Sequence, residues 1–145
     1  MLHMIDPVLS PDLLHTLASM GHGDDLVIVD ANYPGTASGP PCIRADGISA
    51  SAVLRGVLQL MPLDTFVPDP AITMQDVSQP HVTPDAVKDF QSIINETADN
   101  PADVTSLERF AFYERAREGF AVVQTGERRL YGCIILKKGI IRPET

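Results

Sequence analysis

The sequence has no uninterrupted apolar run of 18 residues, and no basic segment leads into an apolar stretch at its start. The first absence argues against a transmembrane helix, and the second against a secretory signal peptide. Cysteine is also scarce, since Cys42 and Cys133 are the only two. Nothing in this usage indicates an oxidising compartment, so we expect a reduced cytoplasmic protein without a membrane partner.

Basic residues are few, with 11 Lys and Arg against 19 Asp and Glu and a formal net charge of −8. This balance repels phosphate backbones and argues against nucleic acid as a partner. Neither G-x-x-x-x-G-K-[ST] nor G-x-G-x-x-G occurs, and Cys and His do not form pairs at zinc-ligand spacing. We therefore expect no cofactor and no metal site.

The 145 residues, of which 44% are hydrophobic, predict one domain that spans residues 1–145. Cap signals and apolar spacing predict helices at 10–20, from Ser49 or Ser51 to Pro62, from Thr83-Pro84-Asp85 to about Thr97, and at 112–117. Apolar runs predict strands at 26–29, 71–74, 120–124 and 133–137. Strands alternating with helices predict an α/β fold, a three-layer α/β/α domain with a mostly parallel or mixed central sheet.

The segment from Met20 to Pro34 places a histidine and a carboxylate around one buried strand. His22 stands between two glycines before the strand, and Asp30 follows it at an edge where α/β sheets often bind small ligands. The two side chains are expected to face one pocket as an acid–base pair. The competing interpretations are a structural or surface histidine and an aspartate that caps the next turn.

The segment 31–41 contains three prolines and two glycines, which predicts an irregular loop. A long loop that leaves a central strand is a usual place for a lid or a pocket wall.

Five blocks of sequence carry a resemblance. They are Gly21-His22-Gly23-Asp24 with Asp30-Ala31 and Pro34, Ile43-Arg44-Ala45-Asp46-Gly47, Arg109-Phe110-Ala111-Phe112-Tyr113-Glu114-Arg115-Ala116, Thr125-Gly126-Glu127-Arg128 with Tyr131-Gly132, and Leu136-Lys137-Lys138-Gly139. In this order the blocks resemble the L-fucose mutarotase branch of the D-ribose pyranase/L-fucose mutarotase family. The matching blocks span nearly the whole chain.

The resemblance implies a cofactor-independent carbohydrate mutarotase, an isomerase that exchanges the anomers of L-fucose or a related aldose. It implies that His22 is the general acid/base and that Asp30 and Arg109 bind sugar hydroxyls, although Arg109 by itself also fits a salt bridge at a helix start. Tyr131, Gly132 and Cys133 would line the substrate site. It further implies a ring-shaped homo-oligomer, a decamer, with its sites near subunit contacts.

Two residues depart from the family pattern near the implied pocket. Cys133 stands where the family has asparagine, and Asn32 replaces a histidine common in the fucose branch. A thiol is a much weaker hydrogen-bonding group than an amide, so these replacements affect which sugar the site binds more than they affect the fold. Two alternatives therefore stay open: a non-catalytic sugar-binding or regulatory protein, and a ribose-type pyranase. The Phe110–Arg115 block favours the fucose branch over the second.

Overall fold

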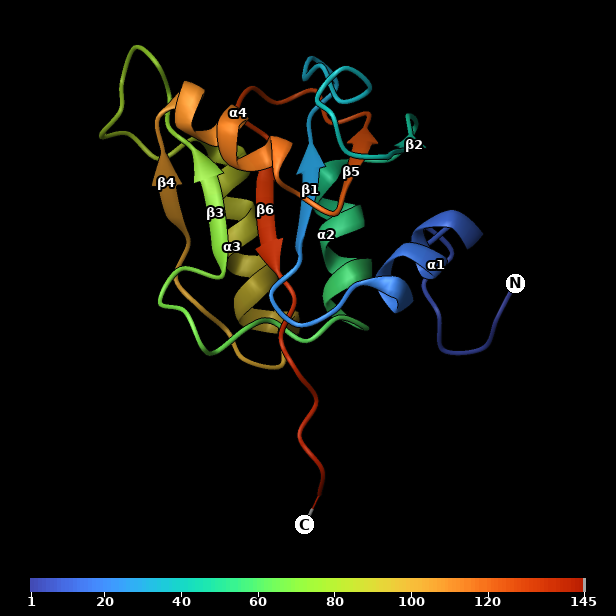
Figure 1. The fold of residues 1–145 in the computed structure, drawn as a ribbon. Coiled ribbons are helices and arrows are strands. Elements are labelled where there is room, and N and C mark those ends of the chain that lie inside the picture. Colours follow the sequence, from blue (N-terminus) through green and yellow to red (C-terminus); the bar gives the residue numbers. More distant parts are fainter. Residues whose placement is uncertain (145) are drawn as a thin grey trace.

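The computed structural model describes residues 1–144, in which helices cover both faces of one twisted sheet (Figure 1). In chain order the elements are α1 Pro11–Ser19, β1 Asp25–Val29, β2 Cys42–Ala45, α2 Ala50–Leu58, β3 Ala71–Met74, α3 Asp85–Thr97, β4 Thr105–Leu107, α4 Arg109–Arg117, β5 Ala121–Thr125 and β6 Ile134–Lys137.

The sheet has six strands in the order β2-β5-β1-β6-β3-β4. Strand β6 runs antiparallel to both of its neighbours, β1 and β3, and the other neighbouring pairs are parallel. Strands β5 and β6 follow each other in the sequence, yet β1 lies between them in the sheet. The expected α/β fold with a mixed central sheet is confirmed.

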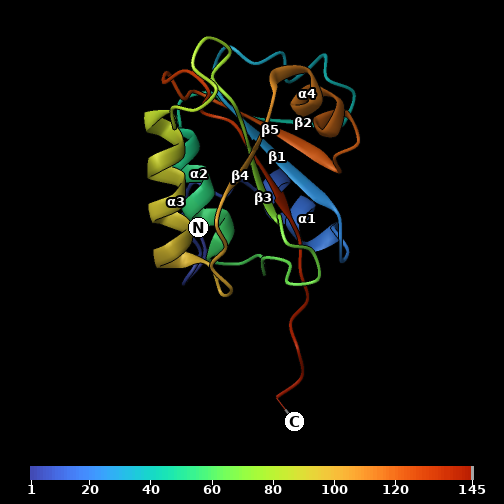
Figure 2. The same ribbon diagram turned by 90° about the vertical axis from the view of Figure 1, so that its left-hand side faces the viewer.

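The two faces of the sheet carry separate apolar cores. On one face Leu26 and Ile28 of β1 pack with residues of α1, α2 and α3, including Phe90. On the other face Val27 and Val29 pack with residues of α4. Figure 2 shows this layering edge-on, with α2 and α3 on one side of the sheet and α4 on the other. The burial of both faces explains why residues 26–29 of β1 are all apolar.

The predicted helix starts are confirmed for α1 and α2. Ser10 accepts the N–H of Leu13, and Ser49, rather than Ser51, accepts the N–H of Ala52. Helix α3 begins at Asp85 as predicted, but Pro84 occupies the cap position and no side chain caps the helix. The hydroxyl of Thr83 therefore does not serve as its cap.

Three elements differ from the sequence-based expectation. Helix α4 begins at Arg109, three residues earlier than expected, because the Glu108 side chain accepts the N–H of Ala111. Strands β2 and β4 were not predicted. Both lie at edges of the sheet, both are short, and most of their residues are half-buried or exposed. Their pairing with β5 and β3 depends on tertiary contacts, which the local sequence does not predict.

The topology brings chemically distinct segments to the two ends of the strands. The parallel strands β1 and β3 end where the antiparallel β6 begins (Figure 1). Helix α4 also starts near this end of the sheet, directly after β4. The opposite end carries the turn between α1 and β1 and the end of β6.

Within residues 1–144 we find no helix that is both long enough and apolar enough to cross a membrane.

A buried ion-pair cluster fixes the start of β1. Asp25, only 8% exposed, accepts a hydrogen bond from Arg115 Nε of α4 at 2.8 Å and one from Lys137 Nζ of β6 at 2.9 Å. The bond to Asp25 is the main cause of the raised pKa of Arg115. The carboxylate thus joins three elements, and removing its charge would leave two cations without their partner.

We expect Asp25→Asn to lower the free energy of unfolding by about 3 kcal/mol, because it leaves the neighbouring cations of a buried cluster unpaired. Urea denaturation at one fixed protein concentration measures the change. Asp46→Asn is the matched control, since Asp46 also pairs with an arginine, Arg44, but at an exposed position. Equal unfolding midpoints for the two variants would contradict a stabilising role for the cluster.

Candidate functional site

A cavity of about 190 Å³ opens at the sheet edge where β1 and β3 end and β6 begins. Its walls combine a carboxylate, a guanidinium and phenol groups with apolar side chains. The lining residues are Asp30, Asn32, Tyr33, Met74, Val77, Arg109, Tyr113, Leu130, Tyr131 and Cys133. Concave sites of this mixed character at the carboxyl ends of strands are usual ligand sites in α/β sheets.

Asp30 is nearly buried, at 8% exposure, and its carboxylate is held from two sides. Oδ1 accepts the N–H of Asn32 at 3.0 Å, and Oδ2 accepts the thiol of Cys133 at 3.4 Å. The bond to Asn32 is the turn-capping role that the sequence also allowed. The same side chain therefore caps the turn and lines the cavity.

Cys133 is buried directly beside Asp30. Its sulfur accepts the N–H of Asp30 at 3.4 Å while its S–H points to the carboxylate. Burial is the first cause, and the charge of Asp30 the second, of the strongly raised pKa of this thiol. The thiol is thus protonated at neutral pH, which makes it a weak donor to Asp30 and a poor nucleophile.

Tyr131 and Gly132 approach the site in different ways. Tyr131 lines the cavity, has a positive φ of 59°, and its hydroxyl accepts the N–H of Val77 at 3.0 Å. Gly132 is not one of the lining residues. A Cβ there would lie 2.7 Å from Glu127 Cγ, so the absence of a side chain lets this segment pack closely.

A charged network behind the cavity supports the segment between β5 and β6. Arg129 donates to both carboxylate oxygens of Glu127, at 3.1 and 3.0 Å, and to Ser51 of α2 and Asp89 of α3. These bonds from Arg129 are the main cause of the lowered pKa of Glu127. The network ties Tyr131 and Cys133 to the helices that cover one face of the sheet.

Arg109 is the first residue of α4 and is exposed at the rim of the cavity. Its guanidinium lies 4.6 Å from the centroid of the Phe110 ring. A guanidinium at this position offers several N–H donors to oxygen atoms of a ligand.

His22 lies at the opposite end of β1, in the turn between α1 and β1. Its Nε2 is 2.8 Å from Asp64 Oδ1, and its ring centroid is 4.8 Å from that of Phe66. The His22 side chain is 41% exposed, whereas that of Asp64 is buried. A carboxylate on one ring nitrogen fixes the orientation of the ring and leaves the other nitrogen for proton transfer.

The expectation that His22 and Asp30 face one pocket is wrong for a single chain. His22 precedes β1 and Asp30 follows it, and β1 is an extended strand of five residues. At about 3.3 Å per residue such a strand separates its ends by about 16 Å. Asp30 lines the cavity, whereas His22 does not. Asp64 and Phe66, which contact the His22 ring, do not line it either.

Sequence reasoning did not single out Asp64, Phe66 or Tyr33. Asp64 and Phe66 lie in the irregular, proline-rich segment after α2, and Tyr33 lies in the loop after β1. The one sequence signal near Tyr33 is the preceding residue, Asn32, which departs from the family pattern. No periodicity or motif marks the other two, because a distant contact brings Asp64 to His22.

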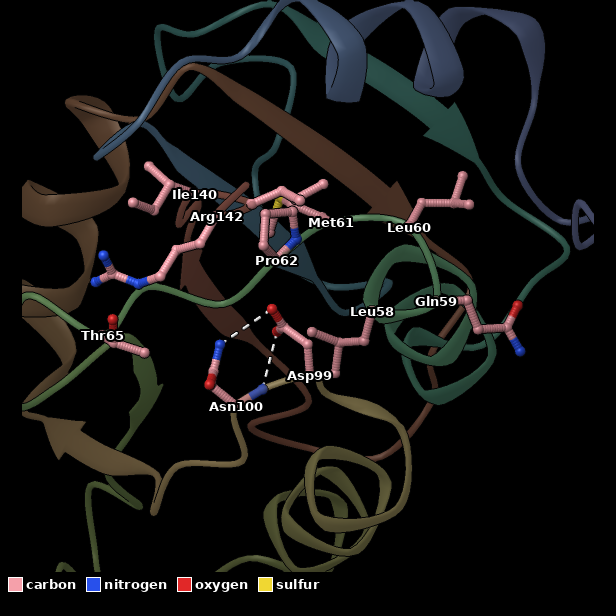
Figure 3. Close-up of a pocket in the computed structure, with 11 residues that line it drawn as sticks. Leu58, Gln59, Leu60, Met61, Pro62, Thr65, Asp99, Asn100, Ile140 and Arg142 are labelled. Atoms are coloured by element: carbon pink, nitrogen blue, oxygen red, sulfur yellow. Dashed lines mark hydrogen bonds between the residues drawn. The ribbon is translucent and has the colours of Figure 1, made fainter. Parts of the chain in front are cut away.

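A larger hollow of about 460 Å³ lies away from the cavity, between the end of α2 and the C-terminal segment (Figure 3). Two of its polar residues, Asp99 and Asn100, bind one another. Asp99 accepts the N–H groups of Leu63 and Asn100, and Asn100 Nδ2 donates to Asp99 Oδ2. We take the smaller cavity as the candidate ligand site because it lies where β1 and β3 end, the usual place for ligands in α/β sheets.

No group of three or more His, Cys, Asp and Glu side chains within residues 1–144 is arranged to hold a metal ion.

Comparison with known proteins gives consistent matches over nearly the whole chain. The fucose mutarotase from Streptococcus pneumoniae, solved in complex with L-fucose, is 40% identical with a TM-score of 0.90, covering 97% of this chain and 100% of that one. FucU from Bifidobacterium longum is 38% identical with a TM-score of 0.89, covering 95% and 99%. Bacillus subtilis RbsD, solved with D-ribose, shares the fold at 19% identity and a TM-score of 0.74.

Residues 3–141 match the RbsD / FucU transport protein family. This match covers almost the entire chain and agrees with the mixed sheet, the order of the sequence blocks and the similarity to solved structures. The chain therefore belongs to the RbsD / FucU family.

Proposed function

We propose that this chain is a mutarotase that exchanges the anomers of a reducing monosaccharide, L-fucose or a related aldose. The observation that carries the proposal is the cavity in which Asp30, Arg109 and Tyr131 converge, in a chain 40% identical to a fucose mutarotase. A carboxylate, a guanidinium and a phenol are groups that bind sugar hydroxyls. The cavity brings all three together.

The reaction requires only proton transfers. The ring oxygen gains a proton as its bond to the anomeric carbon breaks, and the anomeric hydroxyl loses a proton as the aldehyde forms. Rotation about the bond next to the aldehyde carbon exposes its other face, and ring closure reverses both transfers. One well-placed acid/base contributes about 10²–10⁴-fold to such a step. We assign this role to His22, because imidazole exchanges protons near neutral pH.

We further propose that His22 acts on the cavity of a neighbouring copy in a homo-oligomer, for which the family resemblance implies a ring of ten. The separation of His22 from Asp30 by β1 supports a site built from two chains. His22 packs against the exposed Phe66, and the guanidinium of Arg142, the neighbour in sequence of the exposed Ile141, lies 5.6 Å from the centroid of the Phe66 ring. We call these four residues the His22 surface. Clustered exposed apolar residues of this kind are typical of contact surfaces.

Asp64 would then be a positioning residue. Its buried carboxylate holds Nε2 of His22, so that the other ring nitrogen is presented outward to the neighbouring cavity. Phe66 packs against the same ring in a tilted arrangement.

The free thiols of Cys42 and Cys133 support a reducing, cytoplasmic location.

A sugar-binding protein without catalysis is the second candidate, and Cys133 favours it. The thiol is committed to Asp30 on both its donor and acceptor sides, so this position gives a sugar none of the hydrogen bonds of an amide. This candidate predicts saturable binding without faster anomer exchange. Exchange NMR on the anomeric protons of L-fucose, D-ribose and other aldoses separates the two candidates.

We expect His22→Ala to lower the catalysed anomer exchange rate about 10²–10⁴-fold, because it removes the acid/base. The NMR exchange measurement reports the rate, and circular dichroism checks that the fold is unchanged. His15→Ala is the matched control, since His15 is an exposed histidine of α1. A folded His22→Ala variant with wild-type rates would overturn the assignment.

Mixing two inactive variants tests whether each site uses two chains. His22→Ala and Asp30→Asn subunits, refolded together, are expected to regain activity. In a random mixed assembly about a quarter of the sites would combine an intact His22 with an intact Asp30 from the neighbour. The two variants refolded separately are the control. An inactive mixture whose mixed assembly is verified by native mass spectrometry would contradict the two-chain site.

A further inference from the structure

Tyr33 carries a buried hydroxyl that the protein does not use. The residue is 7% exposed, and within residues 1–144 its Oη is the buried side-chain oxygen or nitrogen that lacks a hydrogen-bond partner. Buried polar groups are nearly always paired, so an unpaired one calls for an explanation.

The aromatic ring of Tyr33 is held by α4. Its centroid lies 6.2 Å from that of Phe112 in an edge-on arrangement and 5.3 Å from that of Tyr113. The ring also belongs to the apolar core between α4 and the sheet. Packing therefore fixes the position of the hydroxyl without any hydrogen bond.

The Tyr33 side chain lines the cavity of the candidate site, and its covered hydroxyl lies close to this lining. Asp30 and Cys133 line the same cavity. Burial is the main cause that raises the pKa of Tyr33 well above its usual range, followed by the neighbouring Cys133 and Tyr113, while Arg117 acts in the opposite direction. At neutral pH the phenol therefore keeps its proton and can both donate and accept.

The neighbouring polar groups at the floor of the cavity already have protein partners. The Cys133 thiol is bonded to Asp30, and the Asp30 carboxylate accepts from Asn32 and Cys133. Behind them Gln124 donates to the Asp30 carbonyl and accepts the N–H of Gly35. Tyr33 thus supplies an unpaired polar atom close to Cys133, where the resembled family has an amide.

We propose that the Tyr33 hydroxyl binds a hydroxyl group of the sugar and so determines which monosaccharides the cavity accepts. The inference rests on the proposed function, since it assumes that the cavity binds a sugar. A sugar with a hydroxyl at the carbon facing Tyr33 completes the pairing of the phenol. A sugar with hydrogen or methyl at that carbon leaves the phenol without a hydrogen-bond partner and is bound more weakly.

The test is Tyr33→Phe, which removes one oxygen atom and keeps the ring. Titration of the full-length protein with L-fucose, L-galactose, D-arabinose and monodeoxy analogues, followed by NMR or calorimetry, gives Kd for each sugar. We expect the best-bound sugar to lose about tenfold in affinity, which corresponds to 1.4 kcal/mol. The analogue that lacks the contacted hydroxyl should bind the wild type and the variant equally.

Stability separates a ligand role from a structural one. Because the hydroxyl has no partner within the described chain, Tyr33→Phe should leave Tm of the sugar-free protein unchanged or raise it. A lower Tm would mean that the hydroxyl stabilises the fold, and this would overturn the inference. Unchanged Kd values across the whole sugar panel would also overturn it.

The proposed function and this inference fail in different ways. If the wild type binds a sugar without accelerating anomer exchange, mutarotase activity is excluded, while the Kd comparison still decides the role of Tyr33. If exchange is catalysed and Tyr33→Phe matches the wild type for every sugar, only the inference is overturned. His15→Ala serves as the comparison variant, because His15 is exposed on α1 and we expect this variant to keep both the exchange rate and the sugar preference of the wild type.

Discussion

The pairing of β1 on both of its sides determines where the chemistry of this protein is located. Parallel pairing with β5 and antiparallel pairing with β6 hold β1 fully extended in the middle of the sheet. An extended strand cannot bring its ends together, so His22 and Asp30 lie at opposite ends of β1. The buried Asp25 cluster and the two apolar cores fix this arrangement. A site that needs both residues therefore needs two chains.

Part of the polar lining of the cavity is held in place by hydrogen bonds within the protein. The thiol of Cys133 and the N–H of Asn32 hold the carboxylate of Asp30, and Val77 binds the hydroxyl of Tyr131. Such internal bonds preorganise the site, since the side chains do not have to reorient when a ligand arrives. Under the proposed function, proton transfer to a sugar needs little beyond this order and one well-placed acid/base.

Local signals in the sequence predicted much of the fold. Serine caps at Ser10 and Ser49 and the apolar run of β1 act over a few residues, and the structure contains the elements that they predict. Strands β2 and β4 escaped prediction because they are short edge strands whose stability comes from pairing with a distant neighbour. The early start of α4 escaped because a glutamate provides its cap.

The sequence by itself determined the family and the α/β class, and through the family resemblance it implied that Asp30, Arg109, Tyr131 and Cys133 line one site, where the structure has a cavity. Only the tertiary structure decided that His22 lies at the opposite end of β1, that Asp64 holds its ring, and that Tyr33 presents an unpaired hydroxyl. These facts depend on contacts between residues far apart in the chain. Local patterns record which elements form, whereas the order of strands in the sheet decides which side chains meet.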